Sequence, residues 1–146
     1  MKTANIQIDL KHVVMTPSGA GVFLGNDQKT FVIYVDLLMG EQIRFAFEKK
    51  PQPRPLTFDF VRYLIKSFEI ETNTIVIYKA ENGVFFSRVV FYQPGPMDRV
   101  VEMDLRTSDA ILLSLSLHKP IYIDQGVLNK LPDATEILSN FKRLNK

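Results

Sequence analysis

TSDAILLSLSLHKPIYI, residues 107–123, contains an apolar helix followed closely by a short apolar strand. The body of the helix, Ala110–Leu117, is apolar on nearly every face, and a helix of this kind is normally central and buried. Thr107 or Ser108 is suited to cap its first turn. Pro120–Ile123 then predicts a short buried strand. We therefore expect the domain to have this helix at its centre.

The chain on the N-terminal side of this helix supplies most of the predicted strands. Two strand-like runs, Asn73–Tyr78 and Val84–Tyr92, are joined by Glu81-Asn82-Gly83. Asn-Gly suits a type I′ turn, so these runs predict a β-hairpin. An alternating run, Arg99–Leu105, predicts the next strand and leads into the central helix. Earlier strands are predicted at residues 6–11, 22–24 and 30–35.

Three further helices are expected from apolar residues at helical spacing. The first lies between Leu37 and Phe47 and must end before the proline-stiffened connector Pro51–Pro55. The second begins at Thr57, a good N-cap residue. The third follows the capping-box pattern of residues 133–136.

Strands and helices interspersed in this way predict a single α+β domain. We expect a mixed, largely antiparallel sheet with about four helices. Residues 1–130 are expected to form the domain, and residues 131–146 to add a short C-terminal helix packed on it or extending from it.

Composition restricts the class of protein. The chain has 146 residues, 46% of them apolar and 23% charged, which is typical of one globular domain. It has no cysteine, so disulfides and thiolate metal sites are excluded. No apolar run approaches the roughly 18 residues of a membrane span, and we expect no signal peptide because the N-terminal residues lead into an alternating pattern. We expect a cytoplasmic protein with no membrane partner.

Three ordered motifs resemble the bifunctional nuclease (BFN) domain family of bacteria and plants. Arg54-Pro55-Leu56-Thr57-Phe58-Asp59 is similar to its Arg-Pro-x-Thr-His-Asp motif. Residues 83–89, GVFFSRV, resemble its hairpin strand. Residues 104–111, DLRTSDAI, followed by Pro120-Ile121-Tyr122, resemble its most distinctive run. The order and spacing match from about Ile6 to Leu128.

The resemblance implies an α+β homodimer with activity on RNA and DNA. The chain departs from the family at several positions. Phe58 stands where the family has His, Thr107 where it has Pro, Met39 where it has Glu, and Asp36-Leu37 where it has Gly-Pro. If the His or the Glu takes part in catalysis, the protein keeps the fold without the activity. The alternative function is therefore a non-catalytic dimeric binding or regulatory module.

An acidic cluster near the third motif is the candidate catalytic site. Glu102, Asp104 and Arg106 share one face of a predicted strand, and Asp109 lies in the first turn of the next helix. These groups suit a divalent cation such as Mg²⁺ or Mn²⁺, held through carboxylate oxygens. The alternative is structural, because Asp109 complements the helix dipole and Arg106 can form an ion pair with Asp104 that ties the strand to the helix.

Candidate nucleic-acid contacts lie near the first and third motifs. Arg54, Asp59 and Ser108 are the predicted binding residues, with Arg54 contacting phosphate. A basic patch is the wider possibility, with a solvated helix face as its alternative: Lys49, Lys50, Arg54, Arg62 and Lys66. Aromatic residues of the hairpin can stack on bases, or belong to the core: Phe85, Phe86, Phe91 and Tyr92.

Two further expectations concern histidine and the dimer. His12 and His118 are distant in the sequence and have no cysteine to join, so we expect neither a zinc site nor a catalytic histidine. Leu37, Leu38 and the Phe85–Tyr92 strand are apolar enough to predict a partner surface, which fits a homodimer.

Overall fold

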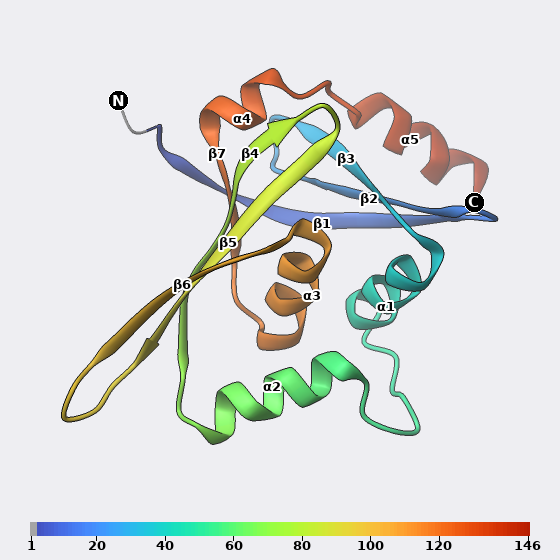
Figure 1. Ribbon diagram of the computed structural model, residues 1–146. Coiled ribbons are helices and arrows are strands. Elements are labelled where there is room, and N and C mark those ends of the chain that lie inside the picture. Colours follow the sequence, from blue (N-terminus) through green and yellow to red (C-terminus); the bar gives the residue numbers. More distant parts are fainter. Residues whose placement is uncertain (1–2) are drawn as a thin grey trace.

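The computed structural model describes residues 3–146, which form one seven-stranded sheet and five helices (Figure 1). The predicted α+β class is confirmed. The strands are β1 (Asn5–Thr16), β2 (Gly19–Gly25), β3 (Thr30–Val35), β4 (Glu71–Glu81), β5 (Val84–Gln93), β6 (Arg99–Arg106) and β7 (Ile121–Asp124). The helices are α1 (Leu37–Phe47), α2 (Thr57–Ser67), α3 (Thr107–Leu117), α4 (Gln125–Lys130) and α5 (Thr135–Leu144).

The short strand β7 joins the two halves of the sheet. The strand order is β3-β2-β1-β7-β4-β5-β6. β7 pairs antiparallel with β1, where Ile8 lies opposite Ile121, and parallel with β4, where Val76 lies opposite Tyr122. The other neighbouring pairs are antiparallel, so the predicted mixed, largely antiparallel sheet is confirmed. A four-residue segment late in the chain therefore holds β1–β3 and β4–β6 together.

α3 is the central helix, as predicted. Figure 1 shows it within the curve of the sheet, with α1 and α2 nearby. Ala110, Ile111, Leu112 and Leu113 are all at most 4% exposed. Ile111 belongs to one apolar cluster with Ile77 of β4 and other sheet residues. Because this helix has almost no polar face, burial on most sides is its most stable arrangement.

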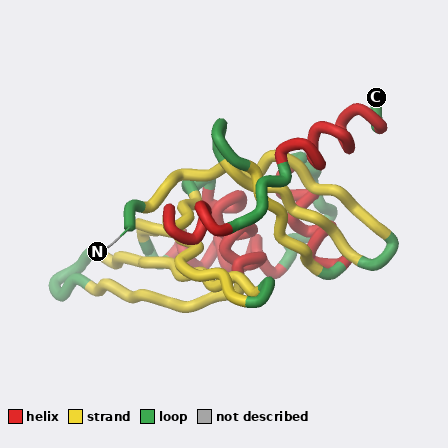
Figure 2. Tube along the Cα trace, turned by 90° about the horizontal axis from the view of Figure 1, so that it is seen from above, coloured by secondary structure: helices red, strands yellow, loops and turns green. Residues whose placement is uncertain are grey.

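A second, smaller apolar cluster holds α5 on the β1–β3 half of the sheet. Phe23 of β2 packs with Ala134 and Leu138, and its ring lies 6.3 Å from that of Phe141. Figure 2, seen from above, shows α5 running along the outside of the molecule to the C-terminus. Among the helices of residues 3–146, none is long and apolar enough to span a membrane.

The β4–β5 hairpin is closed by the predicted turn. Asn82 and Gly83 have φ angles of 51° and 77°, which are the left-handed values that a type I′ turn requires. Phe85, just after the turn, stacks on Phe31 of β3 with ring centroids 6.1 Å apart. Phe85 and Phe91 pack against the main core. Packing in the core, one of the two predicted roles, therefore describes Phe85 and Phe91 better than stacking on bases.

Helix starts differ from the predictions by about one residue. α2 begins at Thr57, so Leu56 is its N-cap, and the Asp59 carboxylate accepts the Leu56 N–H at 2.8 Å. The prediction that Thr57 caps the helix is wrong. α3 likewise begins at Thr107 and follows Arg106, so neither Thr107 nor Ser108 is its N-cap. In α2 the Asp59 side chain therefore supplies the hydrogen bond at the helix start, whereas α3 has no side-chain cap within residues 3–146.

Two local features near the C-terminus also differ. α5 has Ala134 at its N-cap, and Asp133 instead accepts the Thr135 N–H at 3.0 Å, so the reciprocal capping box does not form. α4 was not predicted. Asp124 starts it by accepting the Val127 N–H at 3.1 Å, and also accepts a hydrogen bond from Thr3.

Candidate functional site

The third motif forms the β6–α3 junction. The Arg106 guanidinium donates to both carboxylate oxygens of Asp109, at 2.8 and 3.1 Å. This hydrogen bonding, with the Asp109 charge, raises the pKa of Arg106, and the charge of Asp36 adds to the shift. Arg106 is 71% exposed, so solvent screens the pair. The junction therefore contains a structural ion pair, but the predicted pairing of Arg106 with Asp104 is wrong, because Arg106 pairs with Asp109 and Asp104 accepts from Tyr78.

Glu102 and Asp104 lie on the same face of β6 but contact different partners. Glu102 accepts from Arg88 of β5 at 3.3 Å, and Asp104 accepts from the Tyr78 hydroxyl of β4 at 3.0 Å. The bond to Asp104 raises the pKa of Tyr78. Arg88 also lies 5.3 Å from the centre of the Tyr78 ring. These carboxylates tie three strands together across the open face of the sheet.

The predicted metal ligands do not converge. Within residues 3–146, no three His, Asp or Glu side chains are grouped so that they could hold a metal ion. Glu102, Asp104 and Asp109 each have a separate protein partner instead. The donor set of this junction does not fit a carboxylate-bound Mg²⁺ or Mn²⁺ ion.

A buried hydrogen bond fixes the start of α3. The hydroxyls of Ser87 and Thr107 lie 2.6 Å apart, and the two residues are 0% and 4% exposed. Thr107 is one of the departures from the family motif. Ser108 follows it, half-buried in the first helical turn. The family-like run therefore connects β5, β6 and α3 firmly.

A second region, the basic pocket, lies where α1, the proline-rich connector, α2 and the end of α3 meet. Its volume is about 340 Å³. It is lined by Gln42, Phe45, Ala46, Lys49, Lys50, Gln52, Leu56, Phe58, Asp59, Arg62, Leu112, Leu115, Ser116 and His118. Four of these side chains carry or can carry positive charge, and Asp59 is the one carboxylate among them.

The first motif supplies three lining residues to the basic pocket, Leu56, Phe58 and Asp59. Asp59 accepts from the Leu56 N–H and from an Arg62 terminal nitrogen at 3.3 Å. The Arg62 Nε is buried without a hydrogen-bond partner. A buried donor of this kind carries a free-energy cost unless a ligand or water accepts from it. Phe58 lines the same pocket at the position of the family's His.

The lysines of the pocket differ in how they are held. Lys50 forms an ion pair with Glu48 at 2.9 Å, and this bond lowers the pKa of Glu48. Its ammonium also lies 5.8 Å from the centre of the Phe45 ring. Lys49 has a φ of 54° just after α1, and this left-handed turn leads the chain into the connector. The position at which α1 ends therefore determines where Lys49 and Lys50 lie.

The predicted site residues lie in two separate places, the β6–α3 junction and the basic pocket. Asp109 is in the first turn of α3, whereas Ser116 and His118 are at its end. A helix of 11 residues is about 16 Å long. The structure therefore does not bring Asp59 together with Asp104, Arg106 and Asp109. Arg54 is exposed in the connector and does not line the basic pocket.

Sequence reasoning missed the part of the pocket that comes from α3. His118 was expected only at a helix C-terminus, and it is indeed the C-cap of α3, with a φ of 52°. Its place beside Lys49 and Phe58 depends on the packing of α3 against α1 and α2. The sequence signal for this region was the predicted basic patch, of which Lys49, Lys50 and Arg62 line the pocket and Arg54 and Lys66 do not.

Comparison with known proteins agrees with the motifs. The sequence model of the bifunctional nuclease domain matches residues 22–135. The uncharacterized proteins MT1877 and Rv1829, from Mycobacterium tuberculosis strains CDC 1551 / Oshkosh and ATCC 25618 / H37Rv, are each 27% identical over 111 residues. The match covers 70% of this chain and 64% of each relative, so the chain spans less than two thirds of their length. Because the domain match covers all three motifs and most of the chain, the chain belongs to the bifunctional nuclease domain family.

Proposed function

We propose that this protein binds RNA or DNA through the basic pocket, with Lys49, Lys50 and Arg62 contacting phosphate. The observation that carries the proposal is that Lys49, Lys50 and Arg62 line one cavity, with only one carboxylate among the lining residues that the structure describes. Phosphate oxygens are strong acceptors for guanidinium and ammonium groups. Family membership makes nucleic acid the favoured source of such phosphates.

We propose the same pocket, rather than the β6–α3 junction, as the place of phosphodiester cleavage. Hydrolysis needs a proton-transfer group and positive charge near the phosphoryl oxygens. The pocket contains Asp59, His118 and the cations in one cavity. The carboxylates of the junction are held apart by separate partners, whereas Asp59, although paired with Arg62, lines the same cavity as His118. Asp59 and His118 are therefore the proposed proton-transfer residues.

The binding proposal is tested by fluorescence anisotropy with single- and double-stranded RNA and DNA over a range of salt concentrations. We expect Lys49→Ala with Lys50→Ala to weaken binding of every sequence and to reduce the salt slope by about one per lost phosphate contact. Lys142→Ala with Arg143→Ala in α5 removes the same charge elsewhere and is the matched control. If both double variants lose the same binding affinity, a specific role for the pocket is refuted.

The cleavage proposal is tested with the same substrates in Mg²⁺, in Mn²⁺ and with a chelator. Asp59→Asn and His118→Asn are expected to lower the cleavage rate by about 100-fold or more, as for loss of a general acid or base. Asn suits the left-handed backbone at position 118. Asp109→Asn is the control and should keep the rate. Loss of cleavage in Asp109→Asn, with full activity in the pocket variants, would assign the reaction to the junction instead.

A second candidate function is a non-catalytic dimeric module on the same fold. Phe58 favours it, because a phenyl ring in the pocket cannot transfer a proton where the family offers His. This function predicts binding without cleavage under all the ionic conditions above. A variant carrying Phe58→His that gains cleavage would show that the pocket is otherwise complete.

We propose that the homodimer forms through a patch at the β3–α1 corner. Tyr34, Leu37 and Leu38 are 81%, 43% and 66% exposed there. The other predicted surface, the Phe85–Tyr92 strand, lies between β4 and β6, and most of its aromatic residues are half-buried. Light scattering should give twice the 16.8 kDa chain mass, and Leu38→Glu should return it to the monomer mass. A wild-type monomer would refute the dimer.

A further inference from the structure

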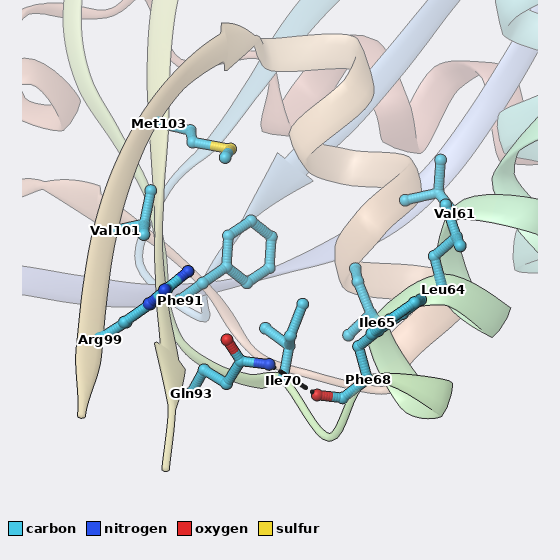
Figure 3. Close-up of a pocket in the computed structure, with 10 residues that line it drawn as sticks. All are labelled: Val61, Leu64, Ile65, Phe68, Ile70, Phe91, Gln93, Arg99, Val101 and Met103. Carbon is cyan, nitrogen blue, oxygen red and sulfur yellow. Dashed lines mark hydrogen bonds between the residues drawn. The ribbon is translucent and has the colours of Figure 1, made fainter. Parts of the chain in front are cut away.

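An apolar groove separates α2 from the lower part of the β5–β6 hairpin (Figure 3). Its volume is about 460 Å³, within the range of about 300–1,000 Å³ usual for small-molecule sites. It is lined by Val61, Leu64, Ile65, Phe68, Ile70, Phe91, Gln93, Arg99, Val101 and Met103. Eight of these ten residues are apolar. The groove shares no lining residue with the basic pocket.

The walls of this apolar groove are exposed although they are apolar. Leu64 and Phe68 of α2 are 41% and 62% exposed, and Val101 and Met103 of β6 are 40% and 50% exposed. Alternation along β6 places residues 99, 101 and 103 on the face toward α2. Both walls therefore keep apolar surface in contact with water, which an apolar ligand would remove.

One end of the apolar groove is polar and has an unpaired cation. Gln93 and Arg99 are opposite each other in the β5–β6 ladder. The Gln93 side-chain amide donates to the Phe68 carbonyl at 3.0 Å. Figure 3 shows the Arg99 guanidinium directed into the groove near Phe91. Within residues 3–146, Arg99 makes no ion pair or side-chain hydrogen bond.

We propose that the apolar groove binds an amphipathic carboxylate, such as a medium-chain fatty acid. Its apolar chain would lie against Phe91, Leu64 and Met103, and its carboxylate would accept hydrogen bonds from Arg99. The charge argues for this occupant, because no Asp or Glu lines the groove and its single charged group is a guanidinium. Guanidinium and carboxylate are matched in geometry as well as charge.

The first test measures binding of decanoate and of the neutral decanol by displacement of the fluorescent anion 1-anilinonaphthalene-8-sulfonate. We expect wild-type protein to prefer decanoate. Arg99→Gln should weaken decanoate roughly three- to tenfold and leave decanol nearly unchanged, since one partly exposed charged contact is lost. Val101→Asp should weaken both ligands, because it places a carboxylate on the apolar wall. Arg143→Gln in α5 is the control for net charge and should change neither.

Two results would overturn the proposal. One is decanoate binding that is unchanged in both Arg99→Gln and Val101→Asp. The other is a second copy of the chain in the apolar groove, seen as a dimer in sedimentation velocity that Val101→Asp dissociates and that decanoate does not affect. Far-ultraviolet circular dichroism of each variant should match the wild type, since positions 99 and 101 are exposed.

Discussion

The two edges of the sheet differ sharply in how they are protected. In β3, Thr30 and Phe31 are each 1% exposed, and the Ala134 N–H donates to the Thr30 carbonyl at 2.7 Å. α5 packs beside this edge through Phe23 and Leu138. In β6, every residue except Leu105 is exposed, and no strand lies beyond it in residues 3–146.

This difference in exposure separates the β1–β3 half of the sheet from the β4–β6 half. The start of the β3 edge is covered by the chain that leads into α5, whereas Tyr34 near its end is 81% exposed. The β6 edge is open, but it alternates apolar residues with Glu102, Asp104 and Arg106, and charged side chains discourage edge-to-edge aggregation. The apolar groove and the family-like motif both lie on the β6 side. The apolar groove therefore lies beside the less covered edge of the sheet, whereas the basic pocket lies among α1, α2 and α3.

The largest expected loss of stability comes from a cavity-forming substitution in the edge strand β3. Phe31→Ala should lower the free energy of unfolding by about 3–5 kcal/mol, because it removes a buried ring and leaves a cavity beside Phe85. Val100→Ala in β6 is the control; Val100 is 68% exposed, and the change should stay within about 0.5 kcal/mol. Urea denaturation followed by circular dichroism measures both. Similar losses at the two edges would contradict the comparison.

A smaller loss of stability is expected at the hydrogen bond that joins β5 to the start of α3. Thr107→Val removes one partner of the buried Ser87–Thr107 hydrogen bond and should cost about 1–3 kcal/mol in unfolding free energy. Ser87→Ala combined with Thr107→Val leaves no orphaned hydroxyl, so the double variant should be more stable than the sum of the single losses predicts. Strictly additive losses in urea denaturation would show that the two hydroxyls are not coupled.

The elements predicted correctly are those whose signal is local. α3 has an apolar residue in nearly every direction, and Asn82-Gly83 sets a backbone conformation that few other pairs adopt. α4 was missed because its six residues are too short for a periodic pattern, and only the cap at Asp124 marks it.

The candidate site was less predictable because it depends on packing between distant segments. Lys49 and His118 are 69 positions apart, and they line one pocket because α3 packs against both α1 and α2. The charged face of β6 was predicted from alternation alone. Its partners, Tyr78 and Arg88, were not, because strand order and register are set by the sheet as a whole.

The smallest expected effect concerns the charge network on the open face. The hydrogen bond to Asp104, together with the aspartate charge, raises the pKa of Tyr78. Asp104→Asn should therefore bring the pKa of Tyr78 down toward its ordinary value, measured by absorbance titration of tyrosinate against the wild type. A group whose pKa is raised on folding stabilises the protein below its unfolded pKa, and that contribution is lost as the pH rises through the folded value. The asparagine variant should thus lose less stability than the wild type as the pH rises above about 10.

Glu102→Gln is the control that separates this bond from the general charge of the face. Glu102 lies on the same side of β6 and pairs with Arg88 rather than with Tyr78. Removing its charge should therefore shift the Tyr78 titration much less than Asp104→Asn. If the two variants shift it equally, the pKa of Tyr78 reflects the summed charge of β6 and not the hydrogen bond. The open edge would then act as a diffuse acidic surface, in contrast to a network of individual pairs that ties β4, β5 and β6 together.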